Sequence, residues 1–581
     1  MMRELVGKPV TVGIVGLIDP RTYQAPGLEG GSVKAAQLPV VMRRLRQVAK
    51  VVMGIKLYDG SPLKVVVAGI PVGGPRDAAI VQQMFEEAGV DCVINSMATW
   101  SMGWETQPFG HPEWPVLYEA MNGTNWPGAV LLNSLRASAT AHLRPVWCSY
   151  PPDVEGLPGS SGELHPVTVQ RIQQFLKAAA AITIMRGKSY ASIGHVSMGI
   201  AGSEPVSDVL SRWFGMKLAH VDQLEAYMRV TQGMYDKEEA QRAVEWFLKT
   251  FEGRIDPQGK RTPAATERLV EQWLVPMTLV VRDIMRGNDA IQDEERSQGL
   301  NAIVGGTAGQ RYWTDWCPNW DFPEAILSSM FDWNGHRPPI TLATENDWAN
   351  GLGMLWGTLL TGYSSLFADL RTYWSPKALE AIGYAAEVHG TKRVGILDLR
   401  NSGPAALEWG TDVANLNIDA RRAAAIEAVE WHPANLGYFP HDGLSTQFQT
   451  PGNRQVTLLR LNRIGPDLTL SVFEGQTVKL PAEIAKKIGE ATDPTWPVTF
   501  VTVDREEGSL SSYEVMSRGI DPNHVVAAIG HIGTEVLTLA AMLRIPVDCH
   551  NIPEKRIWRP TLWTRLGGDR EACRALGPLY A

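Results

Sequence analysis

The hydrophobic and polar positions of the first 150 residues alternate between short apolar runs and amphipathic stretches. Five apolar runs have the length and β-branched content of buried strands. They lie at 10–18, 63–70, 90–96, 128–134 and 144–150. Residues 78–89 repeat apolar positions at helical spacing between two of these runs. Strands interleaved with helices favour a parallel, doubly wound sheet, so we expect an α/β substrate-recognition domain over residues 1–180.

A second α/β domain is predicted over residues 181–362. The stretch 151–166 is rich in Pro, Gly and Ser without periodicity, which is typical of a boundary loop. Amphipathic patterns predict helices at 167–181, 237–251 and 264–287.

The last of these helices has clear end signals. Thr262 is a capping residue and Pro263 suits the first turn, while Gly287 suits the end of the helix. Pro276 lies inside the pattern and cannot donate a backbone hydrogen bond, so we expect a kink there.

The pattern changes after about residue 390. Apolar runs at 456–464, 468–475 and 496–504 are separated by Gly, Pro and Asp turns, which indicates antiparallel strands. We therefore predict an α/β protein with two N-terminal doubly wound domains that have parallel sheets. A mainly antiparallel β domain follows over residues 363–581.

Composition narrows the possible functions. The chain has 581 residues, 44% of them hydrophobic and 20% charged, as in soluble globular proteins of three or four domains. A formal net charge of −8 without a block of Lys or Arg argues against nucleic acid or an anionic membrane as partner. Five scattered cysteines without CxxC spacing, and no apolar run long enough for a membrane span or leader peptide, favour the cytoplasm.

Two acidic residues carry the candidate chemistry. Residues 340–344 are predicted to form a buried strand that delivers Glu345 at its carboxyl end. A helix is expected to start at Asn346 and Asp347 and to stop at Gly362, and the next strand is expected to end at Asp369. Open α/β sheets place ligands at the carboxyl ends of strands, so the two acids are placed where they can face one another.

Two readings of these acids remain open from the residues alone. Carboxylates close together in a poorly hydrated site repel, so one holds a proton or a cation bridges them. Carboxylate oxygens with at most one imidazole suit Mn²⁺ or Mg²⁺ better than zinc in a thiolate cage. Alternatively, Asp369 forms a structural ion pair with Arg371, and Glu345 is an exposed residue at a helix start, where the helix dipole favours it.

Residues 343–376 resemble the metal-binding region of the L-fucose isomerase family, which are aldose–ketose isomerases that also act on D-arabinose. Further segments resemble the family in collinear order, at 188–203, 303–335, 543–551 and 572–581. The resemblance implies Mn²⁺, with Mg²⁺ or another divalent cation possible, bound by Glu345, Asp369 and His524. It also implies that both carboxylates act as acid and base, while His531 is the nearest rival for the imidazole role.

The family resemblance also implies sugar contacts. They fall on Arg21, Trp100, Gln310, Ser402, Tyr438, Trp496 and Asn523. Trp100 would reach the site of a neighbouring subunit, because the family is hexameric with active sites at subunit contacts. Where the family tends to have Gln-Gly-Gln, this chain has Ala308 before Gly309 and Gln310, so one polar contact to the sugar is missing.

The implied reaction moves a proton between C1 and C2 of an aldose. An enediol route needs a base, a conjugate acid and positive charge near two oxygens, and the family favours it over a hydride shift. A glycoside hydrolase could use the same Asp and Glu without a metal, and a sugar-binding protein would leave the sugar unconverted. A nucleotide-binding enzyme would depend on the glycines at 197–203, which lack a phosphate-loop spacing.

Overall fold

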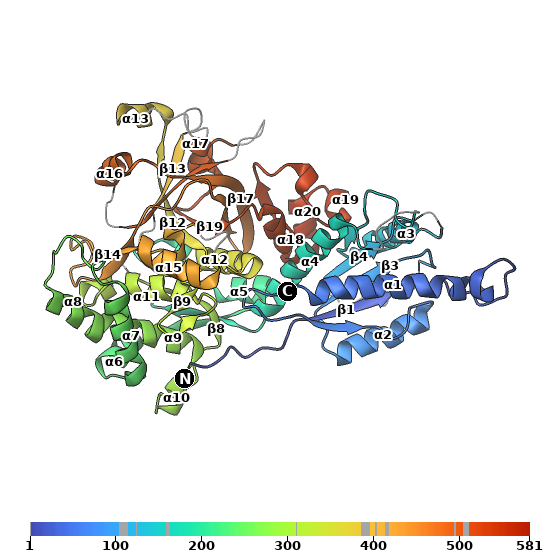
Figure 1. The fold of residues 1–581 in the computed structure, drawn as a ribbon, viewed down its shortest axis with the longest axis horizontal. Helices are drawn as coiled ribbons and strands as arrows, with labels where there is room; N and C mark the ends of the chain where they lie inside the picture. Colours follow the sequence, from blue (N-terminus) through green and yellow to red (C-terminus); the bar gives the residue numbers. More distant parts are fainter. Residues whose placement is uncertain are drawn as a thin grey trace.

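The protein is described by a computed structural model, in which three bodies of secondary structure surround a central helical layer (Figure 1). The structure describes residues 2–103, 114–123, 125–157, 163–309, 311–384, 395–400, 404–412, 417–492, 496–503 and 510–580.

The first body is a five-stranded parallel sheet with helices on both faces. In their order across the sheet its strands are β2 (Lys64–Val67), β1 (Thr11–Gly16), β3 (Cys92–Met97), β4 (Val116–Ala120) and β5 (Trp147–Ser149). Its helices are α1 (Val33–Met53), α2 (Pro75–Glu87), α3 (Gly128–Ala141) and α4 (Pro166–Met185). Alternate strand residues pack against α1 and α4 on one face and against α2 and α3 on the other, as a doubly wound sheet requires.

One predicted strand of this domain is wrong. The run at 128–134 is the start of helix α3, whose buried residues Leu131, Leu135 and Ala139 recur every four positions. The strand that the prediction missed is β4, which contains the charged residue Glu119. Glu119 is fully buried and pairs with the buried Arg44. The charged residue interrupts the apolar pattern of β4, so the pattern alone did not predict this strand.

The second body is a four-stranded parallel sheet. In their order across the sheet its strands are β7 (Lys217–Val221), β6 (Ser189–Ile193), β8 (Ala302–Thr307) and β11 (Thr341–Ala343). Helices around it include α5 (Ser207–Phe214), α6 (Gln223–Thr231), α7 (Lys237–Thr250), α10 (Glu294–Ser297) and α11 (Asp321–Ser328).

The long helix predicted after Thr262 is confirmed, and its hydrogen-bonding pattern is irregular just before Pro276. Thr262 caps α8 (Pro263–Leu269) through a hydrogen bond from Ala265 N, and the helix continues as α9 (Val275–Arg286) to Gly287. Between the two, residues Val270–Leu274 form one π-helical segment. This segment lies directly before Pro276, whose ring displaces the preceding turn.

The third body is a barrel of six antiparallel strands. In order around the barrel they are β16 (Gln455–Ile464), β19 (His524–Ile529), β12 (Leu366–Trp374), β13 (Ile396–Arg400), β18 (Val498–Val503) and β17 (Asp467–Val478), and β17 pairs with β16 to close it. A short strand β20 (Val547–Cys549) pairs with β17 in parallel. The antiparallel strands predicted near 456–464, 468–475 and 496–504 are β16, β17 and β18. The predicted fold class is therefore confirmed.

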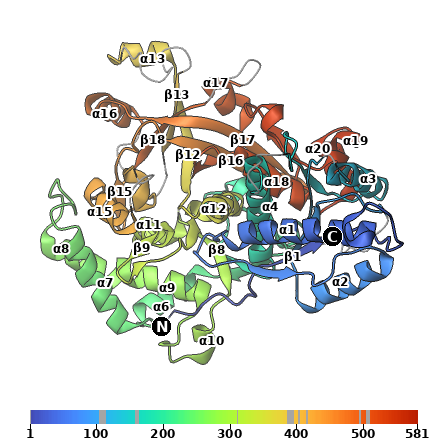
Figure 2. The same ribbon diagram turned by 45° about the vertical axis from the view of Figure 1, so that its right-hand side comes forward.

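Helix α12 (Trp348–Thr361) joins the parallel sheet of the second body to the barrel. It packs against β8 and β11 on one side and against β16 and β19 on the other (Figure 2). Gly353 and Gly357 allow this, because a Cβ atom on Gly353 would lie only 2.9 Å from Leu459 and one on Gly357 only 3.0 Å from Ala528. The residues just before α12 are thereby brought against the barrel wall.

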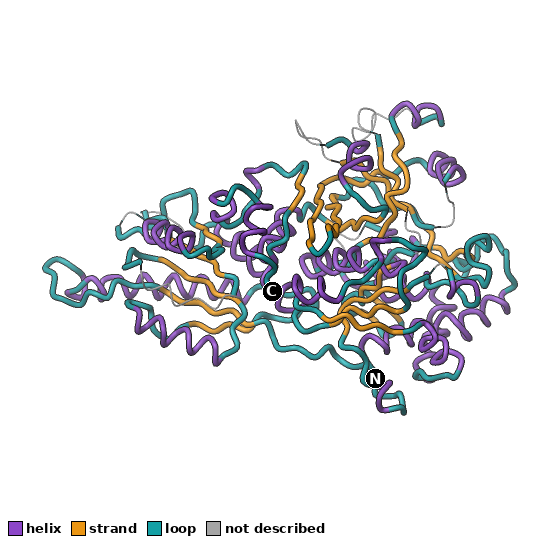
Figure 3. The backbone as a smooth tube through the Cα atoms, turned by 180° about the vertical axis from the view of Figure 1, so that it is seen from behind, coloured by secondary structure: helices purple, strands orange, loops and turns teal. Residues whose placement is uncertain are grey.

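The C-terminal part of the chain returns to the first body, and in the view from behind the C-terminus lies between that body and the other two (Figure 3). Helix α18 (Gly533–Leu543) packs against α4, and Gln174 Nε2 donates to Thr538 Oγ1 over 2.8 Å. Trp558 Nε1 donates to the carbonyl of Cys148 over 3.0 Å. Within the described residues, no helix combines the length and the apolar character that crossing a membrane would need.

Candidate active site

Asp369 and His524 meet through the register of the barrel. Strands β12 and β19 run antiparallel with these two residues directly opposite one another, so their side chains share one face. His524 Nε2 lies 3.3 Å from Asp369 Oδ1. The strand was predicted to end at Asp369, which is wrong, because β12 continues to Trp374 with a register shift after Leu370. Asp369 therefore lies within a barrel strand and not at the carboxyl end of an α/β strand.

Glu345 reaches the same imidazole from the second body. It lies in the short helical turn η5 (Thr344–Asn346) just after β11, and its Oε2 is 3.1 Å from His524 Nε2. Its backbone has φ 55° and that of Asn346 has φ 52°, a left-handed conformation that is strained for residues with a Cβ atom. Glu345 is 4% exposed, so the alternative of an exposed helix-start residue is wrong.

Asn346 holds one side of this strained turn. Its Oδ1 accepts a hydrogen bond from Tyr190 Oη over 3.0 Å, and its Nδ2 donates to Ser192 Oγ over 2.9 Å and to the carbonyl of His195 over 3.0 Å. Gly306 on β8 gives it room, because a Cβ atom there would lie 2.8 Å from the Asn346 Cα. The amide thus ties the turn to β6.

Glu324 stabilises the other side of the strained turn at Glu345. This residue of α11 accepts hydrogen bonds from Thr307 Oγ1 over 2.7 Å and from Thr344 Oγ1 over 2.8 Å, and so links the ends of β8 and β11. Complete burial raises its pKa well above the usual value, and the charges of Asp321 and Glu345 add to the effect. The sequence pattern did not point to Glu324 and marked Asn346 only as the start of a helix, because the hydrogen-bond partners of both residues lie in other elements.

Asp347 fixes the orientation of the imidazole. Its Oδ2 lies 2.7 Å from His524 Nδ1 and accepts a hydrogen bond over 2.7 Å from Arg460 Nη1, while its Oδ1 caps α12. Burial disfavours the charged forms, but the neighbouring carboxylates raise the pKa of His524 well above its usual value. Arg460 and His524 hold the pKa of Asp347 well below its usual range. The sequence identified Asp347 only as part of a helix start.

The donor atoms around His524 fit a hard or borderline divalent ion. Its Nε2 is buried and makes no hydrogen bond, although oxygens of Glu345 and Asp369 lie 3.1 Å and 3.3 Å away. Adjacent ligands of a six-coordinate ion are about 3 Å apart, close to the observed separations. A carboxylate on the opposite ring nitrogen is typical of metal-binding histidines. Among the described residues, no group of three or more His, Cys, Asp or Glu side chains is already arranged to hold a metal ion, so these three side chains would have to adjust to share one.

Aromatic side chains lie beside the acids. Arg371 Nη1 donates to Asp369 Oδ2 over 3.1 Å, so the predicted ion pair exists together with the approach to His524. The same guanidinium lies 5.8 Å from the ring centre of the buried Trp496, which stacks at 6.0 Å with Tyr438. Trp496 Nε1 donates to Asp321 Oδ2 over 3.1 Å. Tyr438 is 51% exposed and therefore lies on the open side of this group.

The chain matches known proteins along almost its whole length. Domain models of L-fucose isomerase match it at 9–187 (first N-terminal domain), 188–362 (second N-terminal domain) and 399–550 (C-terminal domain). An L-fucose isomerase from Bacteroides fragilis is 37% identical over 97% of this chain and 99% of its own length. One from Vibrio vulnificus is 38% identical over 90% and 93%, and one from Clostridium perfringens is 36% identical over 97% and 99%.

The chain belongs to the L-fucose isomerase family. It is accordingly an aldose–ketose isomerase, and the alternatives of a glycoside hydrolase or a non-catalytic sugar-binding protein are wrong. Of the glycines at 197–203, Gly202 has a packing role, since a Cβ atom there would lie 3.0 Å from Arg460 Nη2, and Gly199 has φ 72°.

Of the other predicted sugar contacts in this isomerase, Asn523 lies next to the acids, and Arg21 and Trp100 lie in the first domain. Asn523 precedes His524, is exposed, and accepts a backbone hydrogen bond from Leu370 over 2.7 Å. Arg21 and Trp100 contact one another in the first domain, with the guanidinium 5.6 Å from the ring centre and paired to Asp19.

Two further predicted sugar contacts and the rival histidine do not join the acids in the described structure. Gln310 and Ser402 lie outside the described residues. His531, the rival imidazole, is bound elsewhere: its Nε2 is 3.0 Å from the carbonyl of Gly475. The structure therefore brings His524, and not His531, to the two acids.

Proposed function

We propose that this isomerase interconverts L-fucose and L-fuculose, and D-arabinose and D-ribulose, through an enediol and with a divalent cation. The convergence of Glu345 Oε2 and Asp369 Oδ1 on His524 Nε2 is the observation that carries the proposal. The printed names of the relatives support L-fucose as substrate.

Glu345, Asp369 and His524 would hold Mn²⁺, or Mg²⁺ in its place. When bound, the ion would polarise the substrate carbonyl as a Lewis acid and orient its first two oxygens. The chain prepares for it by fixing His524 Nδ1 on Asp347, so that Nε2 faces the two carboxylates. Ion binding at Nε2 would displace the proton that the surrounding carboxylates favour in its absence.

Glu345 and Asp369 would also move the protons. In the enediol route, a carboxylate takes the proton from C2 of the aldose and a proton returns at C1, while another moves from O2 to O1. Both carboxylates are nearly buried, Glu345 at 4% and Asp369 at 8%, so little water competes for these protons.

Tyr438, Trp496 and Asn523 would form one wall of the sugar site, with aromatic faces against C–H groups and the amide on a hydroxyl. We also propose a cytoplasmic homohexamer in which Trp100 of a neighbouring subunit completes the site. Since Arg21 packs on Trp100, the two would enter that site together. Gln310 and Ser402 remain predicted sugar contacts.

The experiment removes bound metal with a chelator, restores Mn²⁺ or Mg²⁺ separately, and measures ketose formation from L-fucose and D-arabinose. We expect activity to disappear and to return with the ion. Deuterium from solvent should enter the product at C1, as an enediol requires. Full activity after metal removal would contradict the metal role, and product without solvent deuterium would favour the hydride shift.

A further inference from the structure

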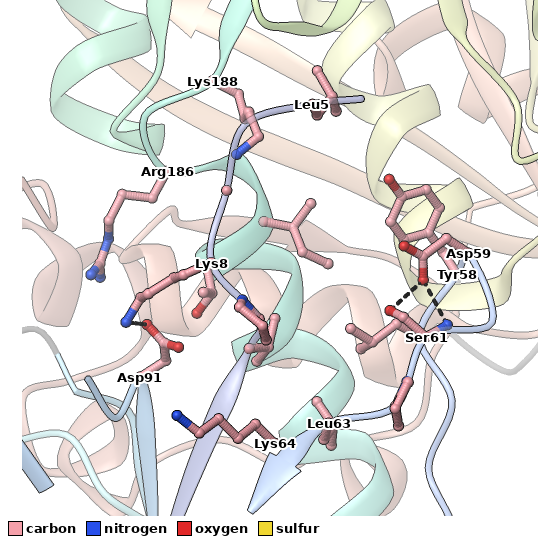
Figure 4. Close-up of a pocket in the computed structure, with 17 residues that line it drawn as sticks. Leu5, Lys8, Tyr58, Asp59, Ser61, Leu63, Lys64, Asp91, Arg186 and Lys188 are labelled. Atoms are coloured by element: carbon pink, nitrogen blue, oxygen red, sulfur yellow. Dashed lines mark hydrogen bonds and ion pairs between the residues drawn. The ribbon is translucent and has the colours of Figure 1, made fainter. Parts of the chain in front are cut away.

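A cavity of about 570 Å³ lies where the first and second bodies join, in the size range of small-molecule sites. Its wall combines the N-terminal segment 5–10, the loop 57–64 and the segment 183–188 that leads from α4 to β6. Figure 4 shows Arg186 and Lys8 along one side, Tyr58 and Asp59 along the other, and Lys188 near the top. None of the acids at His524 lines it.

Lys188 is the unusual residue of this cavity. It is only 7% exposed, and within the described residues its ammonium makes no hydrogen bond or ion pair. Gly7 leaves room for it, because a Cβ atom there would lie 2.7 Å from Lys188 Nζ. Burial lowers the pKa of Lys188, and the nearby Arg286 lowers it further. A buried charge without a partner lowers the free energy of unfolding, so we expect Lys188 to have a function that offsets this loss of stability.

Two neighbours of Lys188 also lack partners in the described part of the chain. The Nε atom of Arg286 is buried and makes no hydrogen bond. The hydroxyl of Tyr58, which lines the cavity, makes none either. Arg286 opposes the rise that burial causes in the pKa of Tyr58, so its positive field reaches that hydroxyl as well as Lys188. Hydrogen-bond donors and positive charge thus gather on this side of the cavity, with the carboxylates of Glu4 and Asp59 as the opposing charges near Tyr58.

The charges of the lining residues leave an excess of two positive. Lys8 and Asp91 form a pair at 2.8 Å and cancel. Asp59, which accepts hydrogen bonds from Ser61, opposes the three remaining cations. These cations are Lys64, Arg186 and Lys188. The carbonyl end of α4 also favours cations at this place.

We propose that this cavity binds a small organic phosphate monoester, with Lys188 as the principal contact of its dianionic head. The excess of two positive charges matches the dianion, and Tyr58 adds a neutral donor. Apolar side chains of the wall would contact the organic part. They are Leu5, Val10, Leu57, Leu63 and Ile184. This binding function is separate from isomerisation.

Calorimetric titration of the full-length protein with glycerol 3-phosphate and with inorganic phosphate, at constant ionic strength, tests the proposal. We expect both to bind and the monoester to bind more tightly. Lys188→Met should weaken binding at least about tenfold, as the loss of a charge-assisted hydrogen bond does. Tyr58→Phe should weaken it about threefold. Lys217→Met removes an exposed lysine at the start of β7 that does not line the cavity and is the matched control, with less than about a twofold change.

Thermal unfolding gives a second, independent measurement. Without phosphate, Lys188→Met should unfold at the same or a higher temperature than the natural chain, because it removes an unpaired buried charge. Glycerol 3-phosphate should raise the unfolding temperature of the natural chain and raise that of Lys188→Met by clearly less at the same concentration. The proposal is overturned if the natural chain binds neither anion at millimolar concentration, if Lys188→Met binds as well as the natural chain, or if only inorganic phosphate binds.

Discussion

The two halves of the candidate active site are built in different ways. In the barrel, Asp369 and His524 are placed by regular antiparallel register, and each stands directly opposite the other. In the second body, Glu345 occupies a strained left-handed turn that side-chain hydrogen bonds of Asn346 and Glu324 hold. Backbone hydrogen bonds therefore fix one half of the site, and individual polar side chains fix the other. The two halves should respond differently to mutation.

The largest loss of activity is expected when Asp369, a ligand of the proposed ion, is changed. Asp369→Asn removes a carboxylate that serves as both ligand and acid–base group, while the barrel register remains. We expect kcat/KM to fall by at least about 10³-fold, with circular dichroism unchanged. Activity within tenfold of the natural enzyme would show that Asp369 has neither role.

Asp347→Asn tests the support of the imidazole. Loss of such a carboxylate costs about 10- to 100-fold in metal affinity, which titration with Mn²⁺ will measure. The change also leaves the buried Arg460 without its ion-pair partner, so stability should fall too. Glu239→Gln is the matched control, because it breaks another buried ion pair, with Arg282, away from the site. It should reduce stability and leave Mn²⁺ affinity unchanged.

Asn346→Asp tests whether the strained turn depends on side chains. The change keeps the shape but places a carboxylate oxygen against the carbonyl of His195. We expect Mn²⁺ affinity and kcat each to fall about tenfold as Glu345 relaxes. Asn551→Asp replaces a buried amide that donates to the Glu474 carbonyl and is the control for stability alone. Equal effects on Mn²⁺ affinity in both variants would refute a specific role for Asn346.

Glu324 allows a comparison of two substitutions. Glu324→Gln should keep kcat/KM within about threefold, since threonine hydroxyls can both donate and accept. Glu324→Leu leaves the hydroxyls of Thr307 and Thr344 unpaired, which costs about 1–3 kcal/mol in the free energy of unfolding. The Leu variant should therefore lose activity that the Gln variant retains. A large loss in the Gln variant would show that the charged form of Glu324 is needed.

The smallest effect on activity is expected at Asp321, where the change falls on the pH dependence of stability. Burial raises its pKa to about 7, the hydrogen bond from Trp496 and the nearby polar groups of Ser445 and Asn319 oppose this, and the charge of Glu345 adds to it. Unfolded aspartate releases its proton near pH 4, so this group makes the folded state less stable as pH rises from about 4 to 7. In metal-free protein, Asp321→Asn should remove about 2–4 kcal/mol of that decline, measured by urea unfolding at pH 5 and 7.5. An unchanged decline would contradict the raised pKa.

Sequence patterns predicted the regular parts of the molecule and missed the parts set by distant partners. The antiparallel strands around 456–464 and the capped helix from Thr262 follow from local periodicity and end signals. Strand β4 was missed because Arg44, which neutralises its Glu119, is 75 residues away. For the same reason Asp347 could be read as a helix start but not as a partner of His524, 177 residues later.

The central claim is that Glu345, Asp369 and His524 share one divalent ion. Crystals soaked with Mn²⁺ and measured at the manganese absorption edge test it most directly. The account predicts one strong anomalous peak about 2.1–2.4 Å from Glu345 Oε2, Asp369 Oδ1 and His524 Nε2. A peak elsewhere, or no peak at these atoms in protein that converts L-fucose, would contradict it.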